Sequence, residues 1–493
     1  MNLSILRTIL WGDQPVFPNL ATGQFDELPA EGLTMGTLFI GRQGTGKTSA
    51  LARHLVCYFK SHPDRAIFVL DWSGSITDII LKLVLQDKEL LKRVVYDELG
   101  HPDWVIPLPE FSHLYGSSFE EQVQRVSVNL QKLSNHLVEK APVIGGAALT
   151  EIAVEIFRLL TAITNEHDET WQITEAKKLL IDTAMLSKAA KIYGYRVPEA
   201  KWYIERELTS DTVKPYERDL RTYMLRTMLG LVEPREIRAR LGYYRPGWTP
   251  REVIHKGLLV LINGARLINQ RNTQHYLFTQ AYSLIMQEIN KRTPGNPNDK
   301  PVALVMDEVY SLLSIPGMAE EVGMLSPLYR SRKLELYVVL QALSQLAPNL
   351  RQQIWSIGNL VSFAVSDFNE AYDISQQLFK YESRTVKLPP KTEQQQPVTE
   401  SDRGQYLNQA NWIQRLNHRE CILRRYYSEQ QQDKYIRHVP KTLDIPPTRP
   451  DYELLSIKES LLKERGVSVR DALEVVNQRK LTFNESGKKP PQV

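Results

Sequence analysis

Residues 41–48 read GRQGTGKT and directly follow the apolar run Thr37–Ile40. This glycine-rich pattern, placed between a strand and a helix, surrounds a β-phosphate with backbone N–H groups and a helix N-terminus. We therefore expect ATP here, with Lys47 reaching the β- and γ-phosphates and the Thr48 hydroxyl binding Mg²⁺. A glycine-rich turn that binds nothing is the alternative. The predicted cofactor-binding residues are Gly41, Arg42, Gln43, Gly44, Thr45, Gly46, Lys47, Thr48 and Ser49.

Two carboxylates end another apolar run, residues 302–306, at Asp307 and Glu308. Transfer of a phosphoryl group to water needs a metal that neutralises the phosphates and a group that orients the water. We expect Asp307 to hold Mg²⁺ and Glu308 to position or deprotonate the attacking water. A solvated acidic pair at a strand end is the alternative.

Two further polar residues end predicted strands. Gln341 follows the run 336–340 and can sense the γ-phosphate, although a glutamine that caps the next helix is the alternative. Asp71 follows the run 66–70 and would lie at the same sheet edge, where open α/β folds bind ligands. It can equally cap a turn.

Arg330, Arg332 and Lys333 lie between the acidic pair and Gln341. Basic groups here can project into the nucleotide of a neighbouring subunit as an arginine finger. An exposed run of charge is the alternative.

Apolar runs at 37–40, 66–71, 94–97, 257–263, 302–307, 336–340 and 360–365 predict an α/β fold with a mainly parallel sheet. From Phe119 to Tyr203 the apolar residues recur at helical spacing, which predicts a large all-α insertion. The predicted division is an N-terminal segment (1–30), a first core half (31–114), the insertion (115–252), a second core half (253–388), a flexible loop (389–403), returning core strands (404–447) and a helical tail with a disordered end (448–493).

Residues 214–251, the basic-aromatic block, carry nine Lys and Arg residues against four acidic ones, with interleaved Tyr and Trp. Such a block can contact nucleic-acid phosphates while its aromatic rings stack on bases. A solvated helix face is the alternative.

The composition of the whole chain restricts the possible functions less than the motifs do. A net charge of +4 over 493 residues neither demands nor excludes nucleic acid. The cysteines, Cys57 and Cys421, lack metal-ligand spacing, which indicates a reducing compartment. No apolar run approaches the roughly 20 residues of a membrane span, and the start lacks the layout of a signal peptide. We expect a cytoplasmic protein.

The motifs occur in the order GRQGTGKT, VLDWSG, LVMDE, SRKLELYVVLQALSQL and IGNLVSFAVSD, with the helical insertion between the core halves. This order resembles the FtsK/HerA superfamily of DNA-pumping ATPases over residues 33–447, and most of all the coupling ATPases of type IV secretion and conjugation. The resemblance implies a RecA-like core and a homo-hexameric ring, with DNA bound without sequence preference in its channel. It also implies ATP and Mg²⁺ at the subunit interfaces.

On this resemblance Lys47, Thr48, Asp307, Glu308 and Gln341 match the nucleotide motifs of the family. Arg332 matches its trans-acting arginine.

The chain also departs from the family. Coupling ATPases usually carry N-terminal membrane helices, so we expect a soluble variant that reaches the inner membrane through a partner, a relaxase or a secretion channel. Ser73 and Ser75 stand where the family often has Lys and Glu, so we expect no catalytic role for that turn. Two other functions stay open: a HerA-like translocase in DNA-end processing, and a nucleotide-gated DNA-binding or scaffolding protein with little motor activity.

Overall fold

The computed structural model describes residues 16–19, 24–27, 36–85, 87–138, 146–163, 171–313, 315, 318, 321–322, 330–379, 385–386, 398–399, 401–424 and 451–478. Most of the predicted N-terminal segment and flexible loop, the stretch 425–447 of the returning strands and the predicted disordered end lie outside these residues. The chain forms two compact units. The first comprises residues 1–94, 254–263 and 289–456, and the second comprises 95–253, 264–288 and 457–493.

The first unit is organised by an eight-stranded sheet of order β13-β10-β3-β9-β8-β4-β7-β5, whose last strand carries the chain into the second unit. Five of the neighbouring pairs, from β10 to β7, are parallel, and β13 is antiparallel to β10. The predicted α/β class with a mainly parallel sheet is confirmed. The strands are β3 (Thr37–Ile40), β4 (Ala66–Asp71), β5 (Val94–Glu98), β7 (Leu259–Asn263), β8 (Val302–Asp307), β9 (Leu334–Leu340), β10 (Asn359–Ser362) and β13 (Ile422–Arg424).

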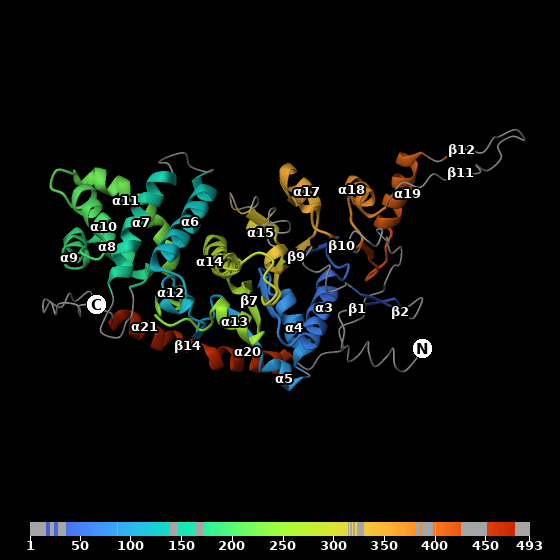
Figure 1. Ribbon diagram of the computed structural model, residues 1–493, viewed down its shortest axis with the longest axis horizontal. Coiled ribbons are helices and arrows are strands. Elements are labelled where there is room, and N and C mark those ends of the chain that lie inside the picture. The colour runs from blue at the N-terminus through green and yellow to red at the C-terminus, as the bar shows by residue number, and fades with distance from the viewer. Residues whose placement is uncertain are drawn as a thin grey trace, which may run out of the picture. The chain divides into compact units, whose positions relative to one another are not determined.

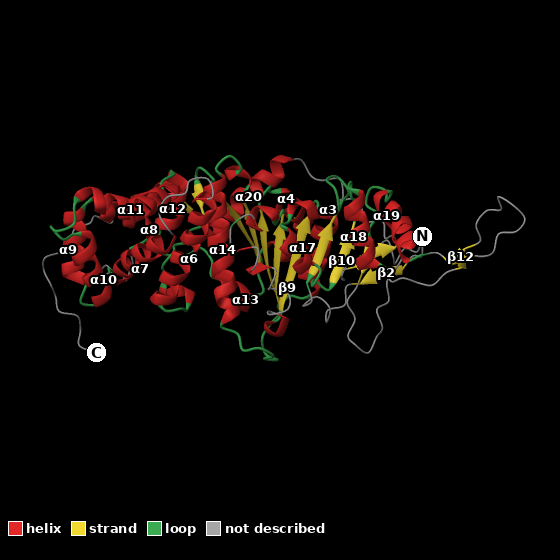
Figure 2. Cartoon of the chain, turned by 90° about the horizontal axis from the view of Figure 1, so that it is seen from above, coloured by secondary structure: helices red, strands yellow, loops and turns green. Residues whose placement is uncertain are grey.

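These strands are near-continuous apolar runs because helices cover both faces of the sheet. Helices α3 and α4 cover one face, and α15 and α17 lie on the other (Figure 1). Figure 2 shows the strands side by side, with β9 and β10 pointing the same way. The helices of this unit are α3 (Lys47–Ser61), α4 (Ser75–Val84), α5 (Lys88–Leu91), α15 (Tyr310–Leu313), α17 (Pro348–Ile354), α18 (Phe368–Leu378) and α19 (Asp402–Gln414).

Two hairpins add short antiparallel pairs to the first unit: β1 (Val16–Asn19) with β2 (Gln24–Glu27), and β11 (Thr385–Val386) with β12 (Val398–Thr399).

Strand register decides which side chains meet at the carboxyl edge of the sheet. Ile40 of β3 pairs with Leu340 of β9, and Met306 of β8 pairs with Val338 of β9. On the other side of β8, Asp71 pairs with Asp307. The residues that follow β3, β9 and β8 therefore emerge at one edge, with the end of β9 between the other two.

Strand β9 is also tied to helix α3 by buried polar groups. The hydroxyl of Tyr58 donates to the Glu335 carboxylate at 2.5 Å, and Arg65 forms an ion pair with the same carboxylate at 3.1 Å. Burial raises the pKa of Glu335 from 4.5 to about 7. The ring of His54 contacts the hydroxyl of Tyr337 at 3.1 Å. These contacts fix β9, whose end lies between the residues that follow β3 and those that follow β8.

Within the described residues, the second unit is helical between residues 119 and 253. It also takes in most of α14 and of the C-terminal segment, which the predicted division assigned to other parts of the chain. The larger helices are α6 (Phe119–Val138), α7 (Gly146–Ala162), α8 (Ile173–Ile181), α9 (Thr183–Tyr193), α10 (Pro198–Tyr203), α11 (Pro215–Leu229), α12 (Arg235–Gly242), α13 (Pro250–Lys256), α14 (Arg271–Asn290), α20 (Asp451–Arg465) and α21 (Val469–Gln478). Strands β6 (Trp104–Val105) and β14 (Val467–Ser468) pair antiparallel.

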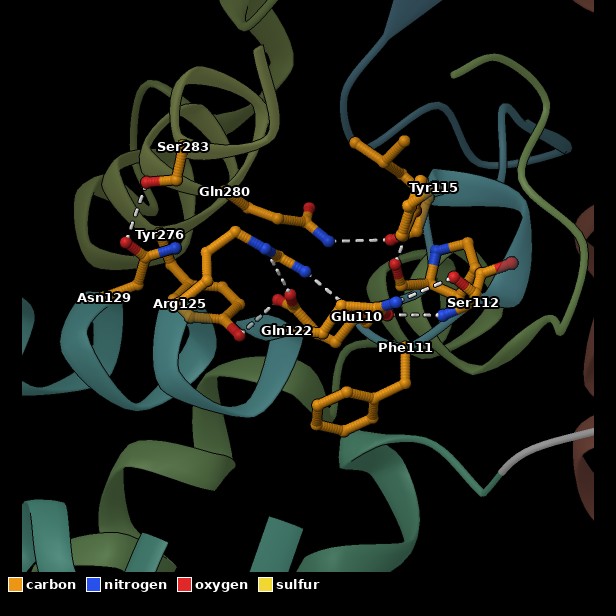
Figure 3. Close-up of polar contacts among 12 residues, drawn as sticks. Glu110, Phe111, Ser112, Tyr115, Gln122, Arg125, Asn129, Tyr276, Gln280 and Ser283 are labelled. Carbon is orange, nitrogen blue, oxygen red and sulfur yellow. Dashed lines mark hydrogen bonds and ion pairs between the residues drawn. The ribbon is translucent and has the colours of Figure 1, made fainter. Parts of the chain in front are cut away.

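The second unit contains an extended stretch, residues 106–112, whose backbone hydrogen-bonds to side chains. Three glutamines serve it: Gln172 binds the Phe111 N–H and carbonyl, Gln122 accepts from the Ser112 N–H, and Gln280 donates to the Leu108 carbonyl. Figure 3 shows part of this arrangement.

A buried carboxylate lies in the middle of the same stretch. Glu110 accepts from Arg125 at 3.1 Å and from the hydroxyl of Tyr276 at 2.5 Å (Figure 3). Because Tyr276 belongs to α14, this helix packs with the insertion. Amphipathic spacing in the sequence predicts a helix, but it does not reveal which partner covers the helix.

The basic-aromatic block is partly structural. Arg240 on α12 is 2% exposed and pairs with both oxygens of Asp97, at 2.7 and 2.9 Å. The indole of Trp248 is buried and donates to the same carboxylate at 3.3 Å. Arg240 and Trp248 therefore belong neither to a phosphate-binding surface nor to a solvated helix face, because a carboxylate 143 positions from Arg240 holds both inside the unit.

We predict that Arg240→Met lowers the free energy of unfolding by ~3–5 kcal/mol, because it leaves Asp97 as a buried charge without its ion-pair partner. Urea denaturation followed by tryptophan fluorescence measures the loss. Arg235→Met, on an exposed position of the same helix, is the matched control and should change stability by less than ~0.5 kcal/mol. Equal effects of the two variants would contradict a structural role for Arg240.

Candidate functional site

The loop after β3 has the backbone that a phosphate cradle needs. Gly41 has φ +153°, and a Cβ atom at this position would lie 2.6 Å from the Cβ of Phe363. Gly46 has φ +102° at the start of α3. The Arg42 N–H donates to the Ala364 carbonyl at 2.8 Å, which fastens the loop to the end of β10. Residues 41–49 therefore lie in the predicted strand-loop-helix setting, between β3 and the start of α3.

Lys47 points into this loop. Its ammonium group donates to the carbonyls of Gly41 at 2.5 Å and Arg42 at 2.9 Å. Burial lowers its pKa from 10.5 to about 8, while Asp307 and Glu308 act in the opposite direction. A phosphate would stabilise the charged form of this amine, which is the role predicted for it.

Asp307 lies across from Lys47 at the end of β8. Burial, then the charges of Asp71 and Glu308, raise its pKa from 3.8 to about 7. Asp71 itself accepts from the backbone N–H groups of Gly74 at 2.8 Å and Thr77 at 2.9 Å. Asp71 therefore has both anticipated roles: it caps the turn after β4, and it lies beside Asp307.

Ser75 lies at this site, although its residue type and local pattern do not predict that position. Its hydroxyl donates to Asp307 Oδ2 at 3.4 Å, and it is 2.8 Å from the hydroxyl of Ser73. The turn for which no catalytic role was expected thus contacts the Asp307 carboxylate through Ser75. The only sequence signal was that strand β4 ends at the same edge as β8.

Glu308 and Gln341 meet, as their strand-end positions predicted. The amide of Gln341 donates to Glu308 Oε1 at 3.3 Å. Glu308 has φ +52°, a left-handed backbone conformation that is uncommon for a residue other than glycine. Burial, then the charge of Asp71, raise the pKa of the Glu308 carboxyl. A carboxylate with a raised pKa beside a phosphate cradle suits a general base.

The donor set fits Mg²⁺. Thr48 and Asp307 offer oxygen atoms, and Mg²⁺ is usually held by one or two carboxylates together with substrate phosphates and water. Among the described residues there is no cluster of three or more His, Cys, Asp or Glu side chains with metal-binding geometry.

Arg332 lies elsewhere. It precedes the amino end of β9, whereas Gln341 follows the carboxyl end, so about seven residues of strand, ~23 Å, separate it from Gln341 and from that edge of the sheet. Its guanidinium donates to Asn290 Oδ1 at 2.7 Å. Arg332 therefore cannot reach the phosphate cradle of its own chain.

The structure also gives a role to Asn359, which begins β10. Its buried amide donates to the Gly36 carbonyl at 2.8 Å and so fixes β10 to the residue before β3.

A second element missed by sequence reasoning is the turn Asn417–Glu420, which precedes β13 and contacts the cradle. The N–H of Arg419 donates to the Thr45 carbonyl at 2.9 Å, and His418 Nδ1 donates to the Gly44 carbonyl at 2.7 Å. No local pattern connects residues so far apart in the sequence.

No protein-family model matches the sequence, and no curated protein matches it either. Solved structures do match in three dimensions. The bacterial conjugative coupling protein TrwBdeltaN70, in an unbound form, aligns with a TM-score of 0.51 over 84% of this chain and 89% of its own, at 16% identity. The chain has the fold of a conjugative coupling protein.

Two further structures agree with this coupling-protein fold. TrwB in complex with the non-hydrolysable GTP analogue GDPNP aligns with a TM-score of 0.50 at 16% identity, over 85% of this chain and 90% of its own. VirB4 of Thermoanaerobacter pseudethanolicus aligns with a TM-score of 0.50 at 12% identity, over 90% of this chain and 98% of its own. At these identities the fold is what is shared. The predicted resemblance, including the RecA-like core, is confirmed at that level.

None of the helices in the described ranges combines the length and the apolar character that crossing a membrane requires.

We predict that Asp307 makes nucleotide-free protein less stable as the pH rises from about 4 to about 7. The unfolded chain loses this proton near pH 3.8, whereas the folded protein keeps it to about 7. Between these values the folded state binds more protons, so the free energy of unfolding falls with increasing pH. Thermal unfolding across this range should show a smaller decrease for Asp307→Asn than for the unmodified protein.

The matched control is Asp211→Asn at an exposed position, which should keep the full decrease. An identical pH dependence in Asp307→Asn and the unmodified chain would show that Asp307 does not carry the buried proton.

Proposed function

We propose that the chain is an ATP-hydrolysing motor that moves DNA, acting as a coupling ATPase in conjugation or type IV secretion. The observation that carries this proposal is the convergence of Lys47, Asp307, Glu308 and Gln341 at one edge of a parallel sheet. The fold shared with TrwB supports it, because one TrwB structure holds a nucleotide analogue.

Each residue of the site has a part in hydrolysis. Lys47 exchanges its two carbonyl partners for the β- and γ-phosphates. Asp307 and Thr48 would hold Mg²⁺, which neutralises phosphate charge when it is bound. Glu308 orients a water molecule and accepts its proton. Gln341, bonded to Glu308, is placed to register whether the γ-phosphate is present.

The position of Arg332 supports a multi-subunit site. Because it cannot reach the cradle of its own chain, it can act on a nucleotide only from a neighbouring copy. We propose a homo-hexameric ring in which Arg332 is the trans-acting arginine. The ring would work on the cytoplasmic side of the inner membrane and contact the membrane through a relaxase or secretion-channel partner.

Glu308→Gln should bind ATP and Mg²⁺ normally but turn over ~10²–10⁴-fold more slowly, because it removes the water-orienting carboxylate and leaves the cradle intact. Binding is measured by titration with a non-hydrolysable analogue, and turnover by phosphate release. Lys47→Ala is the contrasting variant, which should lose turnover while its thermal stability is kept. Wild-type turnover in Glu308→Gln would remove the residue from the mechanism.

Arg332→Ala should slow hydrolysis in assembled protein by up to ~10³-fold and leave nucleotide binding nearly unchanged. The decisive measurement mixes Arg332→Ala with Lys47→Ala subunits. A hybrid interface that joins the intact cradle of one to the intact arginine of the other should regain activity. Arg330→Ala, on an exposed neighbouring position, is the control. If confirmed mixed rings show no recovery at any ratio, Arg332 is a surface residue.

DNA binding should be independent of sequence and should weaken with salt, since log K falls by ~0.7–0.9 per log unit of salt for each neutralised phosphate. The exposed part of the basic-aromatic block is a candidate surface, and Arg240 is not. Arg235→Ala with Arg238→Ala should reduce the salt slope by ~1–2 if that surface meets DNA. DNA should also stimulate ATP hydrolysis. If assembled protein with an ATP analogue binds no DNA at low salt, the motor proposal fails and the scaffolding alternative gains support.

A further inference from the structure

The turn Asn417–Glu420 lies directly against the phosphate-binding loop. Besides its two hydrogen bonds to the carbonyls of Thr45 and Gly44, it brings the Cγ atom of Arg419 within 3.1 Å of the point where a Cβ would stand on Gly46. The glycine is thus needed for the approach of Arg419 as well as for its own backbone angle. Nothing in the catalytic roles described above uses this contact.

The turn adopts a costly backbone conformation that several hydrogen bonds support. Arg419 has φ +70°, where a non-glycine residue costs on the order of 1 kcal/mol or more. The Glu420 carboxylate accepts from both the backbone N–H and the side-chain amide of Asn417, at 2.9 Å each. Arg419 Nε donates to His418 Nε2 at 3.1 Å. Strain that is kept in place by surrounding bonds is typical of ligand-binding elements.

Sheet order decides which end of a nucleotide this turn faces. Strand β3 has β9 on one side and β10 on the other. Asp307, Glu308 and Gln341 lie on the β9 side, so the γ-phosphate end of a bound nucleotide points there. The chain of phosphates runs along the loop, and the nucleoside must therefore leave it on the β10 side.

The turn lies on that β10 side. Because β13 is antiparallel to β10 and pairs Ile422 with Ser362, its first residues begin at the carboxyl edge of the sheet. The turn Asn417–Glu420 immediately precedes them. Arg419 is partly exposed, so its planar guanidinium can lie against a ribose or a base.

We propose that Arg419 forms the nucleoside-side wall of the nucleotide site and that His418 is the positioning residue that fixes this wall to Gly44. The inference rests on the proposed function and names the part of the ligand that the turn reads, the nucleoside of a nucleoside di- or triphosphate. Arginine planes stack on bases with little preference for sequence or base type, so both adenine and guanine nucleotides fit the wall.

The test compares ADP with inorganic tripolyphosphate, which has phosphates but no nucleoside. Arg419→Gly tolerates the left-handed backbone, so the turn keeps its shape and thermal stability while the side chain is lost. We expect the Kd for ADP to rise about 10-fold and the Kd for tripolyphosphate to stay unchanged. Arg403→Ala, at an exposed position near the far end of α19, is the matched control and should change neither.

The kinetics of ATP hydrolysis distinguish the loss of a nucleoside contact from general damage to the site. In both Arg419→Gly and His418→Ala, KM for ATP should rise while kcat at saturating ATP stays within about twofold, because a nucleoside contact is made equally in the ground and transition states. His418→Ala should weaken ADP and not tripolyphosphate. Equal weakening of both ligands, or no change in either, would overturn the proposed wall. If the unmodified protein binds neither ligand and Lys47→Ala changes nothing, the proposed function itself has failed.

Discussion

Three carboxylates and one ammonium group share the carboxyl edge of the sheet, and the rest of the first unit keeps them there. Burial raises the pKa values of Asp71, Asp307 and Glu308, and the charge of Asp71 raises those of Asp307 and Glu308 further. The charge of Lys47 acts in the opposite direction on Asp307 and Glu308, and its own pKa is lowered by burial. Such an arrangement is costly in an isolated chain. Phosphates would balance the charge of Lys47, and a divalent cation would balance the carboxylates. The binding of nucleotide and metal together would therefore lower the energetic cost of this arrangement.

The pairing register of the strands is what places these charged side chains together at one edge of the sheet. A slip of β9 by one residue against β3 or β8 would move every side chain of the strand to the other face of the sheet. The pair formed by Tyr58 and Arg65 with Glu335 opposes such a slip, because it exists on one face only. The polar groups under α3 thus hold the position of Gln341, although they lie on the part of β9 away from the nucleotide.

Much of this site could be predicted because its signals are local. The cradle is a contiguous motif, and Asp307, Glu308 and Gln341 each end an apolar run. The turn Asn417–Glu420 could not be predicted, since its partners Gly44 and Thr45 lie more than 370 positions away. The same holds for Arg240. The sequence shows how many basic residues a helix carries. It does not show which of them is buried through an ion pair with a carboxylate that is distant in the sequence. The fold class followed from strand runs, whereas the membership of α14 in the second unit depended on long-range contacts.

The three glutamines that hold residues 106–112 have a consequence for how the chain is made. They come from α6, from the N-cap of α8 and from α14, so the extended stretch is held much as a peptide ligand is held in a receptor. Gln280 leaves the ribosome after the helices of the insertion and after β7, a strand of the first unit that lies between them in the sequence. At roughly 5–20 residues per second, the helices of the insertion wait several seconds or more for it. The second unit therefore cannot finish folding as its own helices emerge, and a nascent chain stopped before α14 will expose an incomplete core.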